Sequence, residues 1–416
     1  MAVQRSFPDR FLWGAASAAH QVEGGLTNND WWRFEQEGHI RGGDSAAVAC
    51  DHYNRFREDF AELRRLGHNC HRLSIEWSRI EPAPGEFDER EIRHYRDVLG
   101  ELREQGMAPM VTLHHFTSPL WFADRGGWAA AGAPEAFLPF VRKVAEQLGD
   151  LVAMWCTLNE PNVYAVQGWG LGDFPPGRKG DLRGLARVLS NFREAHVACY
   201  RELHRLTPEV PVGLAFNKWL LLPANPAHRR DRLAAGAAQA LMDRWPAGGR
   251  KLERIIDAPA DYIGLNHYGG QLVAFDPTRP GTQFTRRFNP PGVPVSDFDW
   301  PLVPGWMRQV LDELKPRGLP IYITEQGIAA VDDTLRQKFL LDVLEQVWLA
   351  INEDGADVRG YFHWTSMDNF EWAHGYSMKF GLLEVDRATL ERRRRPSAEL
   401  YARIARSNSL PSAEEP

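Results

Sequence analysis

The sequence predicts a single α/β domain, a closed (β/α)8 TIM barrel whose long βα loops form the mouth of an active site. Eight short apolar runs alternate with longer amphipathic stretches along the whole chain, which is the pattern of parallel strands with helical crossovers. No GxGxxG turn follows the first run, and an open, doubly wound sheet would usually carry one. The length of 416 residues suits one barrel with insertions. We therefore expect one catalytic domain over residues 1–406 and a C-terminal tail over residues 407–416.

The eight expected strands are short runs rich in apolar residues. They are Phe11–Gly14, Cys70–Trp77, Ala108–Phe116, Met154–Glu160, Pro211–Asn217, Asp261–Tyr268, Pro320–Glu325 and Val358–Thr365. Helical spacing of apolar residues fills the gaps, as in Tyr53–Leu66 and Leu335–Ile351. Two Pro- and Gly-rich segments, Ala165–Gly184 and Gln271–Pro304, read as long loops. Loops after barrel strands usually shape the active site.

Composition excludes several classes of protein. A formal net charge of −6 argues against a nucleic-acid partner, because binding phosphates requires a basic surface. No run approaches the roughly 20 apolar residues of a membrane span, and no secretory signal precedes the first strand. Four scattered cysteines without a CxxC pair suggest free thiols in a reducing compartment. We expect a cytoplasmic protein, either a monomer or a homo-oligomer.

Two glutamates at expected strand ends are the strongest functional signal. Glu160 ends the fourth strand in WCTLNEP, and Glu325 ends the seventh in IYITEQG. A closed barrel brings both strand ends to one rim, although 165 residues separate them (325 − 160). A single glutamate at such a position is more often a structural ion-pair partner. Two of them match the acid and the second carboxylate that cleavage of a glycosidic bond requires.

Five motifs in order make the sequence resemble glycoside hydrolase family 1, over Phe11 to about Tyr401. They are FLWGAASAAHQVEGG, RLSIEWSRIEP, TLNEP, ITEQG and HWTSMDNFEWAHGYSMKFG. The resemblance implies that Glu160 is the general acid/base and that Glu325 is the nucleophile forming a covalent glycosyl-enzyme. It also implies three supporting catalytic residues: Asn159 on the sugar 2-hydroxyl, and Arg72 and Tyr268 on the nucleophile.

The resemblance further implies the residues that bind substrate. They are Gln21, His115, Glu371 and Trp372 for the outer hydroxyls, Trp364 and Phe380 for the ring, and Asn159 and Asn266 beside the catalytic groups. Trp169 we expect on the aglycone side, because it lies in the loop after the acid/base strand. Three departures stand out: Gln326 and His267 replace a usual Asn and Tyr, and HHFT replaces YHWD, so that His115 is assigned by strand register.

These assignments predict a retaining β-glucosidase acting on cellobiose, short oligosaccharides and aryl or alkyl β-glucosides, with transglycosylation as a side reaction. The two carboxyl groups should lie about 5–5.5 Å apart. No metal or cofactor is needed, and a metal role for His68 and His71 lacks a third ligand. Galactosidase or fucosidase activity remains an alternative, because Gln21 and Glu371 can bond either 4-hydroxyl epimer. A catalytically inactive sugar-binding protein is a second alternative, disfavoured because both glutamates are present.

Overall fold

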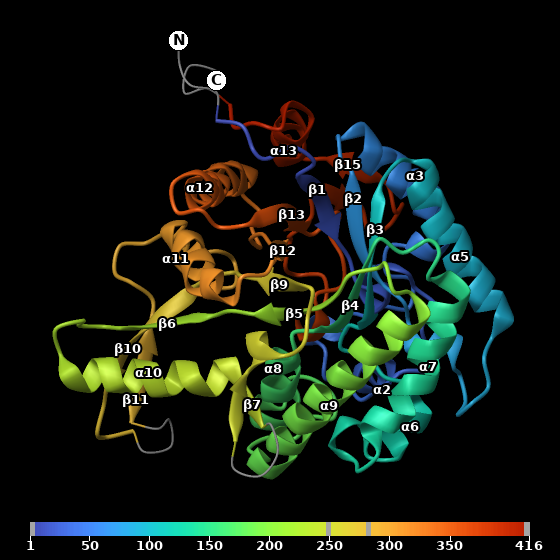
Figure 1. Cartoon of the computed structure of the whole chain (residues 1–416), viewed down its shortest axis with the longest axis horizontal. Helices are drawn as coiled ribbons and strands as arrows, with labels where there is room; N and C mark the ends of the chain where they lie inside the picture. The colour runs from blue at the N-terminus through green and yellow to red at the C-terminus, as the bar shows by residue number, and fades with distance from the viewer. Residues whose placement is uncertain (1–4, 247–250, 280–283, 412–416) are drawn as a thin grey trace.

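The computed structural model of the chain describes residues 5–246, 251–279 and 284–411. Its centre is a closed barrel of parallel strands with helices around it (Figure 1). The expected fold class is therefore confirmed. The eight barrel strands, in chain order, are β1 (Leu12–Ala16), β2 (Cys70–Ser74), β3 (Ala108–His114), β4 (Met154–Asn159), β5 (Val212–Asn217), β9 (Tyr262–Asn266), β12 (Ile321–Gln326) and β13 (Val358–Trp364). β13 closes the ring by pairing with β1.

Each expected strand matches one barrel strand to within a few residues. The largest difference is at β2, which ends at Ser74 and not at Trp77, because Trp77 begins a short helix, α4 (Trp77–Ile80). Alternating side chains of the strands point into the barrel or toward the helices. All five residues of β2 and all six of β4 are accordingly buried.

Helical crossovers join the strands. They are α3 (His52–Arg65), α5 (Glu89–Glu104), α7 (Ala133–Leu148), α9 (Leu182–Leu206), α10 (Arg229–Asp243), α11 (Gly305–Leu314) and α12 (Asp333–Asn352), and α13 (Pro396–Ser407) follows the last strand. The two helices expected from apolar spacing are α3 and α12. Among the described residues, no helix is both long enough and apolar enough to cross a bilayer.

The expectation that Gln271–Pro304 is an irregular loop is wrong in part. Its first residues belong to β10 (Gly270–Phe275), which pairs with β11 (Thr285–Phe288) and with β6 (Leu220–Pro223) in a small separate sheet. α10 packs on this sheet at the side of the barrel (Figure 1). These strands were missed because each is short and its partners lie elsewhere in the sequence. The segment Ala165–Gly184 likewise includes a π-helical turn, η3 (Val166–Leu171).

The expected C-terminal tail does not begin at residue 407. α13 ends at Ser407, and Asn408 accepts a hydrogen bond from the Trp13 indole at 2.9 Å. Leu410 is buried, and Ser409 pairs with Ser6. The terminal residues up to 411 therefore pack on the N-terminal segment, and residues 412–416 of the expected tail lie outside the described part of the chain.

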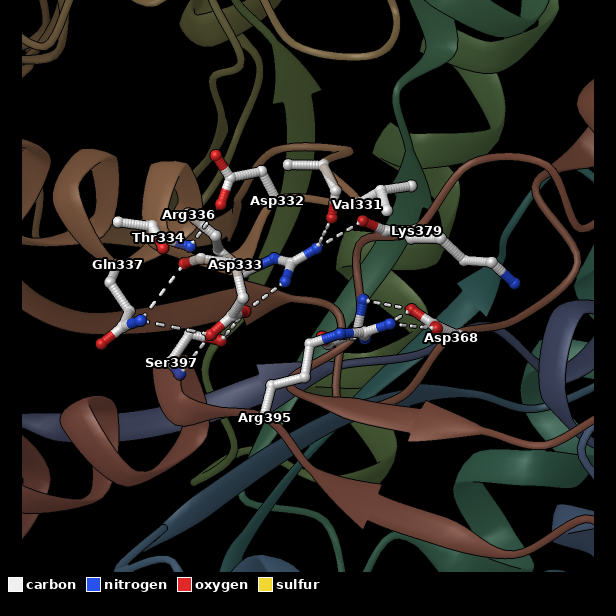
Figure 2. A network of polar contacts seen from close by, with 12 residues as sticks. Val331, Asp332, Asp333, Thr334, Arg336, Gln337, Asp368, Lys379, Arg395 and Ser397 are labelled. Carbon is white, nitrogen blue, oxygen red and sulfur yellow. Dashed lines mark hydrogen bonds and ion pairs between the residues drawn. The ribbon is translucent and has the colours of Figure 1, made fainter.

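A buried ion-pair network fixes the loops that follow β12 and β13 (Figure 2). Arg336, on α12, contacts Asp333 and donates to the carbonyl groups of Ala330 and Lys379. Arg395 donates to both carboxylate oxygens of Asp368, at 2.9 and 2.7 Å. These loops bear Glu371 and Phe380. The network thus attaches side chains of the barrel mouth to the helices outside it.

Candidate active site

One cavity of about 450 Å³ lies at the carboxyl ends of the barrel strands. Glu160, which follows β4, and Glu325, near the end of β12, both line it. Aromatic rings make up much of the rest of the wall, namely Phe34, Phe116, Phe174, Trp219, Tyr268, Phe298, Trp300, Trp364, Trp372 and Phe380. The barrel therefore brings together the two glutamates that the sequence places 165 residues apart (325 − 160). Flat apolar rings around a few polar groups suit a sugar, which has both apolar faces and hydroxyl edges.

Glu325 is held by two hydrogen-bond donors. Arg72, on β2, lies 2.5 Å from Oε1, and the Tyr268 phenol donates to Oε2 at 2.7 Å. All three side chains are buried. Burial raises the pKa of Glu325, and the Arg72 charge and the Tyr268 hydrogen bond counteract that rise. A buried carboxylate with both oxygens occupied in this way has a fixed orientation.

Glu160 lies in a different environment. Its backbone adopts the left-handed conformation with φ of 43°, which costs about 1–3 kcal/mol for a residue other than glycine and is concentrated at functional sites. Oε1 accepts from the amide groups of Asn217 at 3.0 Å and Asn266 at 2.9 Å. Burial, and next the charge of Glu325, raise the pKa of Glu160 to about 7. Desolvation contributes more to this rise than the charge of Glu325 does.

Asn159 connects the two halves of the site. Its Oδ1 accepts from Arg72 Nη2 at 2.7 Å and from Asn266 Nδ2 at 3.1 Å. Its Nδ2 lies 3.1 Å from Nε2 of His115. His115 lines the cavity and its neighbour His114 does not, as the alternation of side chains along a strand requires.

The remaining expected sugar binders surround the same cavity. Glu371, Trp364, Trp372 and Phe380 line it. Gln21 is fully buried behind them and donates to Glu371 Oε2 at 3.3 Å, while its own Oε1 has no hydrogen-bond partner among the described residues. Burial, and then the charge of Glu325, raise the pKa of Glu371 to about 8.

Three of the expected binders are not on the cavity wall: Gln21, Trp169 and Asn266. Trp169 is buried, packs on Tyr164 with ring centroids 5.5 Å apart, and lines a separate hollow of about 230 Å³. It is not on the wall of the main cavity, because η3 turns its side chain inward. Asn266 is also absent from that wall and is fully buried. It bonds the carboxyl group of Glu160, so its contact is with the enzyme and not with the cavity.

Several residues of the site were not expected from the sequence. Asn217 is the last residue of β5 and lines the cavity. The strand-end rule that located Glu160 could have located it. Phe298 and Trp300 also line the cavity and stack with ring centroids 4.6 Å apart. They lie in the segment predicted as a loop, where no periodicity marks a side chain as facing a cavity.

The structure also bears on metals and thiols. Within the described ranges, no three His, Cys, Asp or Glu side chains are grouped so as to hold a metal ion. All four cysteines are buried and free. Cys156 lies 3.9 Å from Arg72, but burial raises the pKa of its thiol, which makes it a poor nucleophile.

A closed (β/α)8 barrel with two buried glutamates in one aromatic cavity, one paired with a guanidinium and the other bonded by neutral amides, is the arrangement of a glycoside hydrolase. The model of glycosyl hydrolase family 1 matches residues 3–248 and 249–410. This chain belongs to that family.

Individual relatives agree over nearly the whole chain. Beta-glucosidase A of Thermotoga maritima is 32% identical, with 98% of this chain and 99% of the relative covered. Among solved structures, a beta-glycosidase from Pyrococcus horikoshii is 37% identical with a TM-score of 0.90, covering 99% of this chain and 97% of that one. The Thermotoga maritima beta-glucosidase in complex with glucoimidazole is 31% identical with a TM-score of 0.91, covering 98% and 100%.

Proposed function

We propose that this chain is a retaining β-glucosidase. It removes terminal non-reducing β-D-glucosyl residues from cellobiose, short oligosaccharides and aryl or alkyl β-glucosides. The observation that carries this proposal is the unequal pair of glutamates in one cavity. Glu325 accepts from a guanidinium and a phenol, which stabilise its charged form against the effect of burial, whereas Glu160 accepts only from two neutral amides and its pKa is raised to about 7. One group is suited to attack as an anion and the other to donate a proton.

In the first step, Glu325 attacks the anomeric carbon and forms an ester bond. The bond from that carbon to the leaving oxygen breaks, and the leaving oxygen takes the proton of Glu160. In the second step, a water molecule gives one proton to the Glu160 carboxylate and its oxygen bonds the anomeric carbon. The ester bond then breaks and Glu325 regains its charge. Two inversions give net retention, for which we expect carboxyl groups about 5–5.5 Å apart.

The change of role of Glu160 follows from charge. While Glu325 is an anion, it raises the pKa of Glu160, which keeps the acid protonated. The ester has no charge, so that contribution disappears in the intermediate, and Glu160 becomes ready to accept a proton from water. A hydroxyl group of a second sugar in the aglycone space can replace that water, which gives transglycosylation.

Glucose would be recognised by the polar and aromatic groups around the cavity. The outer hydroxyls of the sugar would be bonded by Gln21, His115, Glu371 and Trp372. Asn159 would bond the 2-hydroxyl. The sugar ring would pack on Trp364 and Phe380. Glu371 disfavours a 6-phosphorylated sugar, because its carboxyl group offers the phosphate no positive charge and repels it when ionised. The four buried free thiols favour work in a reducing compartment such as the cytoplasm.

Two experiments test the proposal. In the first, NMR of the first-formed sugar should show the β-anomer, and the α-anomer would refute retention. In the second, Glu325→Ala should lower turnover by orders of magnitude with the fold intact, and Glu160→Ala by about 10²–10⁴-fold, least for good leaving groups. A panel of nitrophenyl glycosides decides the sugar: faster cleavage of the galactoside or fucoside would replace glucose as the preferred substrate.

A further inference from the structure

Two side-chain amides meet on one oxygen of Glu160, and the two-step reaction gives neither of them a task. Asn217, from β5, and Asn266, from β9, both donate to Oε1. We propose that both are positioning residues that keep Oε1 of Glu160 as a hydrogen-bond acceptor, so that the transferable proton is carried by Oε2. This inference rests on the proposed function of Glu160 as the acid.

The direction of the Asn266 amide is fixed by an arginine. A guanidinium can only donate, so the Asn159 oxygen that lies 2.7 Å from Arg72 Nη2 must accept. The Asn266 atom 3.1 Å from that same oxygen must then be the amide nitrogen. This nitrogen also lies 2.9 Å from Oε1 of Glu160. On its other side, Asn266 Oδ1 accepts from the Thr324 hydroxyl at 2.7 Å, which agrees with this orientation.

A second donor completes the shell around Oε1. The Asn217 amide lies 3.0 Å from it. A carboxyl oxygen has two lone pairs available for hydrogen bonds, and the two amides occupy both. A proton on Oε1 would point at a donor, so it belongs on Oε2. No residue in the described part of the chain is hydrogen-bonded to Oε2, and Glu160 lines the cavity, which leaves Oε2 to face the leaving oxygen.

The charges around Glu160 make these two bonds matter. Four groups interact electrostatically with Glu160. They are Glu325 from β12, Arg72 from β2, Tyr268 from the loop after β9 and Glu371 from the loop after β13. Burial and Glu325 raise the pKa of Glu160, whereas the two amides and Arg72 lower it. Without an amide donor the carboxylate form loses stabilisation, and Glu160 would hold its proton to a higher pH.

Asn217 is the better residue to change, because Asn266 also bonds Asn159. The backbone carbonyl of Asn217 accepts from the Asn162 side chain at 2.9 Å, and this bond survives truncation of the Asn217 side chain. Asn162→Ala is therefore a matched control. It disturbs the same strand end without removing a donor from Glu160.

The test is the pH profile of kcat/KM for phenyl β-glucoside, whose leaving group needs the acid. Asn217→Ala should move the basic limb upward by roughly one pH unit and slow this substrate about tenfold at the optimum. Cleavage of 2,4-dinitrophenyl β-glucoside, which hardly needs the acid, should change much less. Asn217→Asp should move the limb further, because two carboxyl groups would then share a proton. Asn162→Ala should leave the limb in place.

An unmoved basic limb in both Asn217 variants would overturn the inference, as would an equal shift in Asn162→Ala. If Asn217→Ala does not fold, judged by circular dichroism, Asn217→Ser and Asn217→Asp provide the same comparison. Glu160→Ala separates this result from the proposed function. If Glu160→Ala is fully active on the phenyl glucoside, Glu160 is not the acid and the proposed function fails. If Glu160→Ala loses activity but the basic limb stays in place in the Asn217 variants, only the role of the amides is refuted.

Discussion

The hydrogen bond from Tyr268 to Glu325 can be removed with little disturbance of the packing around it. Tyr268→Phe deletes the hydroxyl group that lies 2.7 Å from Oε2. The ring remains, with its centroid 5.5 Å from that of Trp300 and 6.1 Å from that of Phe380. Arg72 still pairs with the other oxygen. The substitution therefore isolates one donor to the expected nucleophile.

A hydrogen bond to a charged group contributes about 1.5–3 kcal/mol, and one pKa unit corresponds to about 1.4 kcal/mol. If the phenol stabilises only the carboxylate, its loss raises the pKa of Glu325 by about 1–2 units. Glu325 must be ionised to attack, so activity at acid pH should fall. We expect the acid limb of kcat/KM to move upward by that amount, and the activity at pH 5 relative to pH 7 to fall by at most about 6–25-fold.

The assay is the pH dependence of kcat/KM for 4-nitrophenyl β-glucoside between pH 4 and 8 (roughly the range in which carboxyl groups of raised pKa titrate). Tyr262→Phe is the matched control. Tyr262 is a buried tyrosine of β9 whose hydroxyl donates to the backbone carbonyl of Trp155 at 2.8 Å and not to a carboxylate. It should lose stability without a shift of the acid limb. An acid limb that stays in place in Tyr268→Phe would refute the reasoning.

Three further predictions concern the cavity wall, the loop and the core. Trp300→Ala should raise KM for aryl glucosides more than it lowers kcat, since it removes a ring of the cavity wall that donates no hydrogen bond to either glutamate, and an unchanged KM would contradict this. Trp169→Ala should lower the free energy of unfolding by about 3–5 kcal/mol, because Trp169 is buried. It should leave the order of preferred aglycones unchanged, because Trp169 does not line the main cavity. A changed order in a panel of substrates would show that Trp169 does act on the aglycone side. Burial lowers the pKa of His68 to about 3. Below about pH 6.5 the His68 side chain therefore becomes protonated in the unfolded chain but stays neutral in the folded chain. His68 consequently lowers the free energy of unfolding as the pH falls. His68→Phe should therefore gain about 2 kcal/mol relative to the parent between pH 7 and pH 5 in denaturant titrations, and a pH-independent difference would contradict this.

Parts of the fold without sequence periodicity were predicted least well. The barrel strands were found because each is a buried apolar run next to an amphipathic helix. β6, β10 and β11 were missed because a strand of four to six residues at the side of the barrel is defined by its partner and not by its own pattern. The C-terminal residues 407–411 resemble a tail in sequence, and only the contact with the N-terminal segment makes them part of the domain.

The sequence by itself determined the architecture and the two carboxyl groups, because apolar periodicity and strand-end positions are local properties. It also placed Arg72 and Tyr268 with the nucleophile through the family resemblance, and the structure brings both within hydrogen-bond distance of Glu325. Only the tertiary structure decided that burial, more than Glu325, raises the pKa of Glu160. It also decided that Asn217 and Asn266 share one oxygen of that residue and that Trp169 faces away from the cavity. Desolvation and hydrogen-bond direction depend on groups far apart in the chain, so no local pattern can encode them.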